Sequence, residues 1–115
     1  MSAILDQYGL NFYKRKSPYT DKFFYYCDSK SISNRPLSSH LSSFGKGDVT
    51  EALGYIRSIE NNTPLIPEAD FVANDATEVR FVPPNAIIDE NNQNYSILIT
   101  DLKQIYLEWL DFLNT

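Results

Sequence analysis

The chain has 115 residues, enough to bury one hydrophobic core and too few for two ordinary domains, so we expect a single domain over residues 1–115. Hydrophobic residues make up 43% and aromatic residues 14%, which excludes a disordered chain. One cysteine excludes an internal disulfide, no apolar run approaches the ~20 residues that span a bilayer, and the first residues lack the order of a secretory signal. These features predict a cytoplasmic protein without a membrane partner.

The net charge of -5 conceals an asymmetry between the two halves of the chain. Residues 1–57 carry eight Lys or Arg against five Asp or Glu, whereas residues 58–115 carry two against ten. An acidic surface attracts a basic partner, raises the encounter rate in a salt-dependent way and repels nucleic acid. The second half therefore predicts a basic protein partner and no direct contact with nucleic acid.

The first 47 residues predict one clear strand and leave the preceding segment open. Residues 4–14 fit either a short helix or a strand interrupted at Gly9. Residues 21–29 are dense in aromatic side chains and predict a strand. Residues 30–47 are Ser-rich and predict a connection that can include one helical turn after Pro36.

Two amphipathic helices are predicted. The first covers residues 49–60, where Asp48 followed by Glu51 is a variant of the capping box and apolar residues recur at helical spacing. The second covers residues 101–114, with Thr100 or Asp101 as its cap. Its apolar face, which we expect to bury Trp109 in the core, is formed by Leu102, Ile105, Tyr106, Trp109, Leu110 and Leu113.

The second half also predicts three strands. Residues 77–82 alternate apolar and polar side chains and end at Pro83-Pro84. Residues 86–89 and 94–100 flank a polar tract, 89–94, that is compatible with a six-residue hairpin connection. The expected fold class is α+β (mixed): an antiparallel-rich sheet of about four strands, packed by the helices at 49–60 and 101–114 in two layers.

The sequence carries no catalytic or metal-binding signature. A metal site needs several ligands at matched spacing, and His40 and Cys27 are the only residues of their types. The tract 89–94 resembles the start of a calcium loop, but Asn94 stands where the turn glycine is needed and Thr100 where the last Glu is needed. We predict no metal, no cofactor and no enzymatic activity.

His40 and Cys27 each allow a chemical and a structural interpretation. His40 lies in a Ser-rich stretch, where we expect a solvated loop histidine rather than a catalytic one. Cys27 lies within an aromatic run, where we expect a small buried side chain rather than a reactive thiol. The paired carboxylates of the second half lie in polar contexts and are expected to be solvated surface rather than an acid and base pair.

Residues 12–26 support an alternative function. Lys14, Arg15 and Lys16 lie among aromatic residues, a combination that holds single-stranded nucleic acid through phosphate contacts and base stacking. The acidic total charge argues against this hypothesis, and a strand needs aromatic side chains for its core in any case. A small nucleic-acid-binding protein is therefore the second hypothesis.

A family resemblance is carried by residues 35–62, RPLSSHLSSFGKGDVTEALGYIRSIENN. A lead-in rich in Leu, Ser and Phe and an acidic cap precede a helix of the form E-x-L-G followed by an aliphatic residue, matched by Glu51, Leu53, Gly54 and Ile56. This stretch resembles proteobacterial immunity proteins of contact-dependent growth inhibition systems. The ending YSILITDLKQIYLEWLDFL is similar in style.

The resemblance implies a protein that binds and neutralises the toxin domain of a large surface effector after it enters a neighbouring cell. Many such toxins are nucleases, some of them RNases, and a nuclease is basic because it binds phosphates. The resemblance implies no contact residues, since immunity proteins differ at the surface that faces the toxin. From the acidic half of the chain we predict the toxin-binding residues Asp70, Asp75, Glu78, Asp89 and Glu90. Turn and recognition surface are compatible roles for the tract 89–94.

Overall fold

The structure is a computed structural model that describes residues 2–64, 71–90 and 92–115. The helices are α1 (Ala3–Tyr8), the short 3-10 helix η1 (Ile32–Asn34), α2 (Arg35–Ser43), α3 (Lys46–Glu60) and α4 (Ile99–Leu113). The strands are β1 (Leu10–Lys16), β2 (Phe23–Ser29), β3 (Phe71–Ala73), β4 (Thr77–Val82), β5 (Asn85–Glu90) and β6 (Gln93–Leu98).

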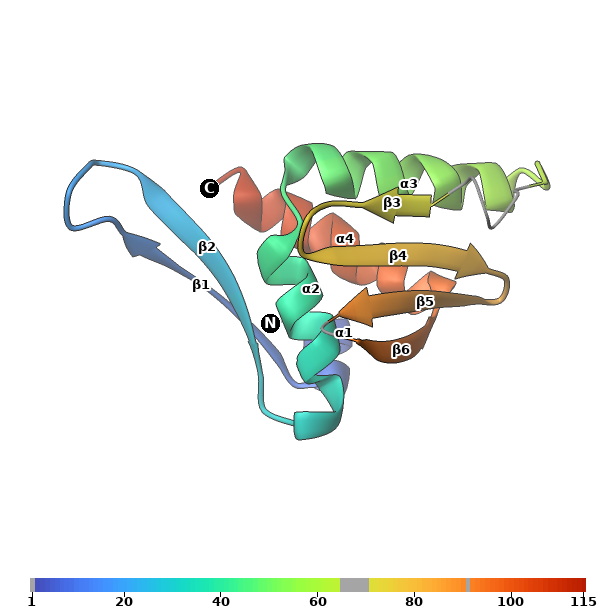
Figure 1. Cartoon of the computed structure of the whole chain (residues 1–115), viewed down its shortest axis with the longest axis horizontal. Coiled ribbons are helices and arrows are strands. Elements are labelled where there is room, and N and C mark those ends of the chain that lie inside the picture. The colour runs from blue at the N-terminus through green and yellow to red at the C-terminus, as the bar shows by residue number, and fades with distance from the viewer. Residues whose placement is uncertain (1, 65–70, 91) are drawn as a thin grey trace.

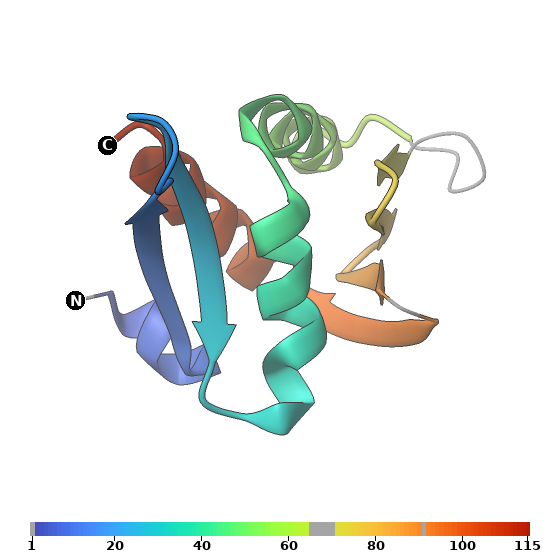
Figure 2. The ribbon, with the colours of Figure 1, turned by 60° about the vertical axis from the view of Figure 1, so that its left-hand side comes forward.

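The fold is α+β, as predicted, with one four-stranded antiparallel sheet in the order β3-β4-β5-β6 and a separate hairpin of β1 and β2. Helices α2, α3 and α4 all lie on one face of the four-stranded sheet, and α2 stands between the sheet and the β1–β2 hairpin (Figure 2). We call the opposite face of the sheet the outer face. No helix of the described residues covers the outer face.

The β1–β2 hairpin, which we call the arm, projects from the body of the molecule (Figure 1). It gives the molecule a long axis of 45 Å against 28 and 27 Å for the other two. The arm is rooted where Phe12 and Tyr25 pack against Phe112 of α4, with ring centroids 5.6 and 5.5 Å apart. Beyond this root its side chains are mostly exposed.

The segment before β2 forms both of the elements that its sequence left open. Helix α1 ends at Gly9, whose φ of 65° is the left-handed conformation that glycine adopts at little cost. The carbonyl of Gly9 accepts a hydrogen bond from the amide of Lys30 at 2.9 Å, so this turn also fixes the end of β2. The prediction of a strand at 21–29 is confirmed, since β2 covers most of it.

The prediction of a Ser-rich connection with one helical turn was wrong, because this region contains the nine-residue helix α2. Serine is a poor helix former, but Leu37 and Leu41 lie on one face of α2 and are completely buried. Pro36 lies in the first turn, where its missing N–H costs nothing. Burial of one apolar face therefore outweighs the weak propensity of the sequence.

Both predicted long helices exist but begin earlier than predicted. Helix α3 begins at Lys46, and Asp48 lies in its first turn, where its carboxylate accepts a hydrogen bond from the amide of Gly45 at 3.3 Å. Helix α4 begins at Ile99, directly after β6, without a side-chain cap. The proposed cap Asp101 instead accepts a hydrogen bond from the Tyr8 hydroxyl at 2.6 Å, which fastens α1 to α4.

The hairpin of β5 and β6 is tighter than predicted. The strands continue through the polar tract, so that Asp89 pairs with Asn94 and Glu90 with Gln93. The six-residue connection was therefore a wrong prediction, because polar residues at the end of a strand can extend its ladder when one face is solvated. Pro83-Pro84 ends β4, as predicted, and forms the turn into β5.

The core lies between the helices and the inner face of the sheet. Trp109, predicted as a core residue, is 1% exposed, donates its indole N–H to the Phe44 carbonyl at 3.0 Å and meets Phe12 edge to face. The largest fully buried side chains include Trp109, Tyr106, Phe44, Phe81, Leu37 and Leu41. One buried cluster thus joins the arm, the helices and the sheet.

Candidate functional site

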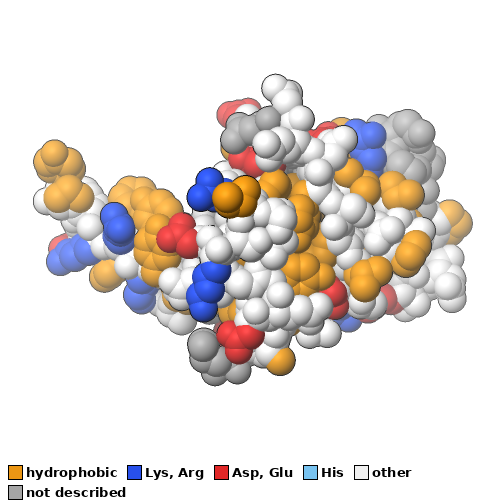
Figure 3. Space-filling view, turned by 90° about the horizontal axis from the view of Figure 1, so that it is seen from below, with side chains coloured by type: hydrophobic (Ala, Val, Ile, Leu, Met, Phe, Trp, Pro, Cys, Tyr) orange, Lys and Arg blue, Asp and Glu red, His pale blue; other side chains and the backbone are white. Residues whose placement is uncertain are grey.

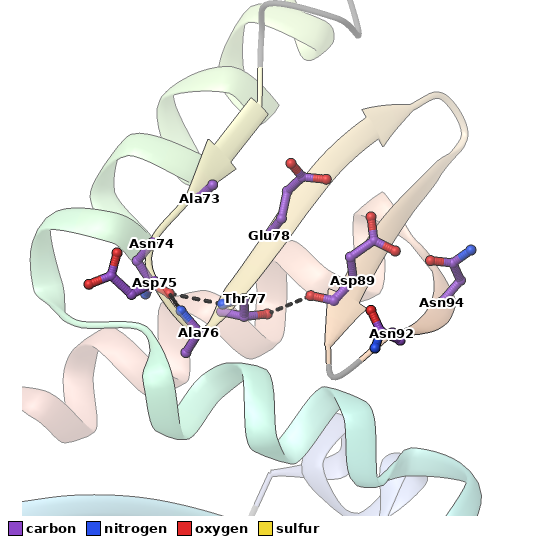
Figure 4. Close-up of a pocket in the computed structure, with 9 residues that line it drawn as sticks. All are labelled: Ala73, Asn74, Asp75, Ala76, Thr77, Glu78, Asp89, Asn92 and Asn94. Carbon is purple, nitrogen blue, oxygen red and sulfur yellow. Dashed lines mark hydrogen bonds between the residues drawn. The ribbon is translucent and has the colours of Figure 1, made fainter.

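The candidate site is a pair of carboxylates on the outer face, Glu78 of β4 and Asp89 of β5, which we call the acidic pair. The register of the two strands places them directly opposite each other, and both carboxylates point to the same side of the sheet (Figure 4). Two like charges in this position destabilise a sheet by roughly 0.2 to 1 kcal/mol. The arrangement therefore works against stability.

Arg80 compensates only part of this charge. Its Nη2 donates to Glu78 Oε2 at 3.1 Å, and its guanidinium lies over the Phe71 ring at 5.9 Å. This ion pair is partly exposed and contributes little to stability. Asp89 takes part in none of the ion pairs formed by the described residues. The part of the outer face that carries Glu78 and Asp89 therefore keeps a net negative charge.

The acidic pair lines an open hollow of about 620 Å³ near the β3–β4 turn. Its other lining residues include three asparagines, Asn74, Asn92 and Asn94. Asparagine amides both donate and accept hydrogen bonds, so the hollow combines negative charge with groups that can bind polar side chains or backbone. Its shallowness and polarity suit contact with the surface of a macromolecule better than enclosure of a small molecule.

Asn74 fixes the shape of this hollow. Its Oδ1 accepts hydrogen bonds from the amides of Ala76 and Thr77 at 2.9 and 3.0 Å, the pattern by which asparagine stabilises a tight turn. Its Nδ2 donates to the Ser43 carbonyl at 2.8 Å and to Asp48 Oδ2 at 3.2 Å. The β3–β4 turn is therefore attached to the junction of α2 and α3.

A buried chain of hydrogen bonds supports the acidic pair from beneath. The Thr77 hydroxyl donates to the Asp89 carbonyl at 3.2 Å, so it accepts from His40 Nδ1 at 2.9 Å. The other ring nitrogen, Nε2, then accepts from the Tyr106 hydroxyl at 2.6 Å. This assignment satisfies each group with a neutral imidazole. The chain connects the core to the backbone of Asp89.

Burial controls the protonation of this hydrogen-bonded chain. Burial lowers the pKa of His40 to about 3, and it raises the pKa of Tyr106 well above its ordinary value. The expectation of a solvated loop histidine was therefore wrong, because α2 carries His40 on its buried face. The expected burial of Cys27 is confirmed at 4% exposure, and burial raises the pKa of its thiol to about 12.

The structure brings together only two of the five predicted toxin-binding residues, Glu78 and Asp89. Asp75 lies at the rim of the same hollow, in the β3–β4 turn, with its carboxylate pointing away from the pair (Figure 4). Glu90 lies on the opposite face of β5 and is buried, because side chains alternate along a strand. Asp70 lies outside the described residues.

Two residues that shape the site, Asn74 and Thr77, are not among the predicted site residues. Asn74 precedes Asp75 between two strands, and an Asn-Asp dipeptide in that position is a recognisable turn signal. Thr77 carried no such signal, since its role depends on the register of β4 and β5. Asn94 lies in the tract 89–94, for which the sequence allows a recognition role. Within residues 2–64, 71–90 and 92–115, no group of three His, Cys, Asp or Glu side chains is placed to hold a metal ion.

The basic and aromatic residues of the stretch 12–26 gather on the arm. Tyr13 stacks on Tyr26 with ring centroids 5.3 Å apart, and the Arg15 guanidinium lies 5.5 Å from the Tyr13 ring. Phe24 is 53% exposed and lies opposite Arg15 on the neighbouring strand. Blue and orange side chains gather along the arm at the left of Figure 3.

Comparison with known proteins adds no family. No family model matches the chain, and neither the curated proteins nor the solved structures that were searched contain a match. None of the helices in the described part of the chain is long and apolar enough to cross a membrane.

Proposed function

We propose that this protein is an immunity protein that binds and neutralises a basic nuclease toxin domain, most simply an RNase, of a contact-dependent growth inhibition effector. It acts in the cytoplasm as a stoichiometric inhibitor that covers the active site of the toxin, without a cofactor and without catalysis of its own. The observation that carries the proposal is the acidic pair, two like charges side by side on the outer face.

The acidic pair supports a binding role because the ion pairs of the described residues offset only part of its repulsion in the free protein. Glu78 has one partly exposed ion pair with Arg80, and Asp89 has none within the described residues. A basic side chain placed between the two carboxylates would relieve their repulsion. The free energy that the pair costs the free protein would then be recovered on binding.

The rest of the outer face has the composition of an interface. Val82 and Leu98 are 46% and 48% exposed, and Phe71 and Ile87 lie half-buried between them and the acidic pair. Apolar side chains gathered on an uncovered sheet face favour a protein partner, with the charged residues at the edge setting its orientation.

Charge complementarity explains why the partner should be a nuclease. A nuclease presents cations to the phosphates of its substrate, so its active site attracts carboxylates. An inhibitor with clustered carboxylates associates rapidly at low salt and more slowly as salt rises. The net charge of -5 and the acidic second half of the chain are consistent with this partner.

The proposal is tested with the toxin domain encoded by an open reading frame directly upstream of the gene for this protein. We expect the two purified proteins to form a 1:1 complex that loses nuclease activity. The double variant Glu78→Gln, Asp89→Asn should weaken the complex by at least about tenfold, mainly by slowing association. Glu51→Gln, which removes one exposed charge from α3, is the matched control and should leave affinity unchanged.

Two results would contradict the proposal. One is a genome that lacks an effector gene upstream. The other is a complex whose association rate is independent of salt between low and physiological ionic strength, since the acidic pair would then contribute nothing to encounter.

A second candidate function is favoured by the arm. Tyr19, Phe23, Phe24 and Tyr26 are all substantially exposed, and four cations lie within the same hairpin: Lys14, Arg15, Lys16 and Lys22. Such a surface can bind single-stranded RNA by stacking and phosphate contact. Fluorescence anisotropy with labelled oligouridine discriminates between the two functions. Tight, salt-sensitive binding that Phe24→Ala abolishes would favour nucleic-acid binding over toxin inhibition.

A further inference from the structure

A second cavity, of about 610 Å³, lies on the other side of β5 from the acidic pair. Its floor is the polar face of α2, where spacings of three and four residues bring one arginine and four serines into a row: Arg35, Ser38, Ser39, Ser42 and Ser43. Its walls are the end of β2, from Cys27 to Ser29, and Glu90 at the end of β5. We call this cavity the serine groove.

Glu90 is the unusual group in the serine groove. The residue is only 8% exposed, and its Oε2 is buried with no hydrogen-bond partner among the described residues. Leaving a buried charged group unpaired costs more free energy than leaving a neutral polar group unpaired. Arg35 lines the same groove, yet no ion pair of the described residues includes either side chain. Such a carboxylate needs an explanation.

The surroundings of Glu90 supply further hydrogen-bond acceptors. The Ser38 hydroxyl donates to the Arg35 carbonyl at 2.9 Å. The Ser42 hydroxyl donates to the Cys27 carbonyl at 3.1 Å and already accepts from the Cys27 amide at 2.9 Å. A hydroxyl oxygen has two lone pairs, so Ser42 can still accept one further hydrogen bond, as can Ser38. A carboxylate beside several hydroxyl oxygens matches the needs of a compact cation with three donors.

We propose that the serine groove binds the ammonium group of a lysine side chain that the partner protein inserts, with Glu90 as its counter-charge. An ammonium fits better than a guanidinium. A guanidinium binds a carboxylate through both of its oxygens at once, and the Oε2 of Glu90 is buried. The terminal torsion of a glutamate is soft, so either carboxylate oxygen can turn toward the entering cation.

The identity of the partner rests on the proposed function, and the serine groove adds a second contact to it. Asp89 and Glu90 are neighbours whose side chains lie on opposite faces of β5. The end of the β5–β6 hairpin therefore presents carboxylates to both sides. A basic partner that binds both faces of this end of the sheet would place one cation at the acidic pair and one lysine in the serine groove.

The test uses n-butylammonium, an analogue of the lysine side chain, titrated into the protein labelled for NMR. We expect saturable shifts of the Glu90 carboxyl carbon and of the Ser39 and Ser43 amides. Glu90→Gln should weaken the binding at least about tenfold, the effect of losing a charge-assisted hydrogen bond. Glu51→Gln should not change it, and neutral n-butanol should not bind. Absence of a saturable shift at Glu90 would overturn the proposal.

Two further measurements separate the remaining explanations. If Glu90 is unpaired in the free protein, Glu90→Gln should raise the urea midpoint of unfolding. If Glu90→Gln and Arg35→Gln instead lower it equally, the two residues pair in solution and the proposal fails. In the toxin complex, Glu90→Gln should cost about tenfold in affinity. If Glu90→Gln leaves the affinity of that complex unchanged but Asp89→Asn lowers it, the groove proposal fails while the proposed function survives.

Discussion

His40 ties the core of the protein to the surface that carries the acidic pair. Its imidazole links the Tyr106 hydroxyl in α4 to Thr77 in β4, and Thr77 continues the chain to the Asp89 carbonyl. A buried polar group is tolerated only when its partners are in place, and here each nitrogen has one. The position of Asp89 therefore depends on the protonation of a residue in the interior.

We predict that His40 makes the protein sensitive to acid. The pKa of His40 in the folded protein is about 3, below its ordinary value of 6.5. Between these two pH values the imidazole is protonated in the unfolded chain and neutral in the folded protein. The free energy of unfolding should therefore fall by about 1.4 kcal/mol per pH unit as the pH drops from 6 toward 3. Urea unfolding at several pH values measures this slope.

The control is His40→Gln, which lacks the titrating group but keeps all carboxylates. It should be less stable at pH 7 and should lose stability more slowly than the wild-type protein below pH 6. Because His40 is the only histidine, NMR can also follow its imidazole directly. The prediction would be contradicted if the free energy of unfolding fell equally with decreasing pH in both proteins, or if the imidazole titrated near pH 6.5.

Among the elements, β4 and β5 create the acidic pair by their register. A shift of one residue would send one carboxylate to the core face, so the pairing of Val79 with Ile88 in the core also fixes Glu78 opposite Asp89. Thr77, Val79 and Phe81 are buried on the inner side of β4, as the alternating pattern predicts. The core therefore determines the geometry of the surface.

Relief of the like-charge pair should stabilise the free protein. Asp89→Asn keeps the shape of the side chain and removes one charge, so the free energy of unfolding should rise by about 0.2 to 1 kcal/mol at low salt. Urea denaturation measures the difference, with Glu51→Gln as the single-charge control. A loss of stability in Asp89→Asn would mean that the carboxylate has a structural partner, and the argument for a binding role would fail.

Replacing each of two glycines by alanine should change the stability of the protein in opposite directions. Gly9 ends α1 with φ at 65°, where a Cβ costs roughly 1 to 2 kcal/mol, so Gly9→Ala should destabilise the protein by about that amount. Gly54 lies inside α3, and beyond the helix's own backbone and the adjoining residues nothing lies within 4 Å of an added Cβ, so Gly54→Ala should stabilise the protein by about 0.5 to 1 kcal/mol. Thermal unfolding of both variants compares the signs, and equal signs would contradict the assigned conformations.

On the scale of the whole molecule, the arm and the outer face differ in character. The arm carries cations and exposed aromatic rings (Figure 3), whereas the outer face carries the acidic pair and the aliphatic side chains of Val82, Ile87 and Leu98. α2 stands between the two sheets and contacts both. The protein thus carries two surfaces of different chemistry on opposite sides of α2.

The outer part of the arm should be dispensable for folding. Residues 15–24 lie beyond the contact of Tyr25 with Phe112, and an Asn-Gly turn can join Lys14 to Tyr25 because these residues are paired. We expect the shortened protein to keep its urea midpoint and its affinity for the proposed toxin partner. A large loss of stability would show that the arm belongs to the core, and a loss of toxin binding alone would make the arm part of the interface.

Much of the fold could be predicted from local patterns. The alternation in residues 77–82 predicted β4, and the apolar spacing in the last 15 residues predicted α4. The structure confirms both the strand and the helix. Helix starts were less predictable, since neither Gly45 nor Leu98, the residues that precede α3 and α4, has a side chain that caps the helix. Asp48 bonds the Gly45 amide from within the first turn of α3 instead of preceding the helix. The Ser-rich helix α2 was missed because its stability comes from burial rather than from propensity.

The sequence by itself determined the α+β class, the acidic second half, the lack of a catalytic motif and the presence of carboxylates in the tract 89–94. Only the tertiary structure decided which carboxylates act together: it joined Glu78 to Asp89, turned Asp75 away and buried Glu90 on the other face. It also moved His40 from an expected loop into the core. The physical reason is that charge and local periodicity belong to the chain, whereas proximity across strands and burial depend on long-range pairing.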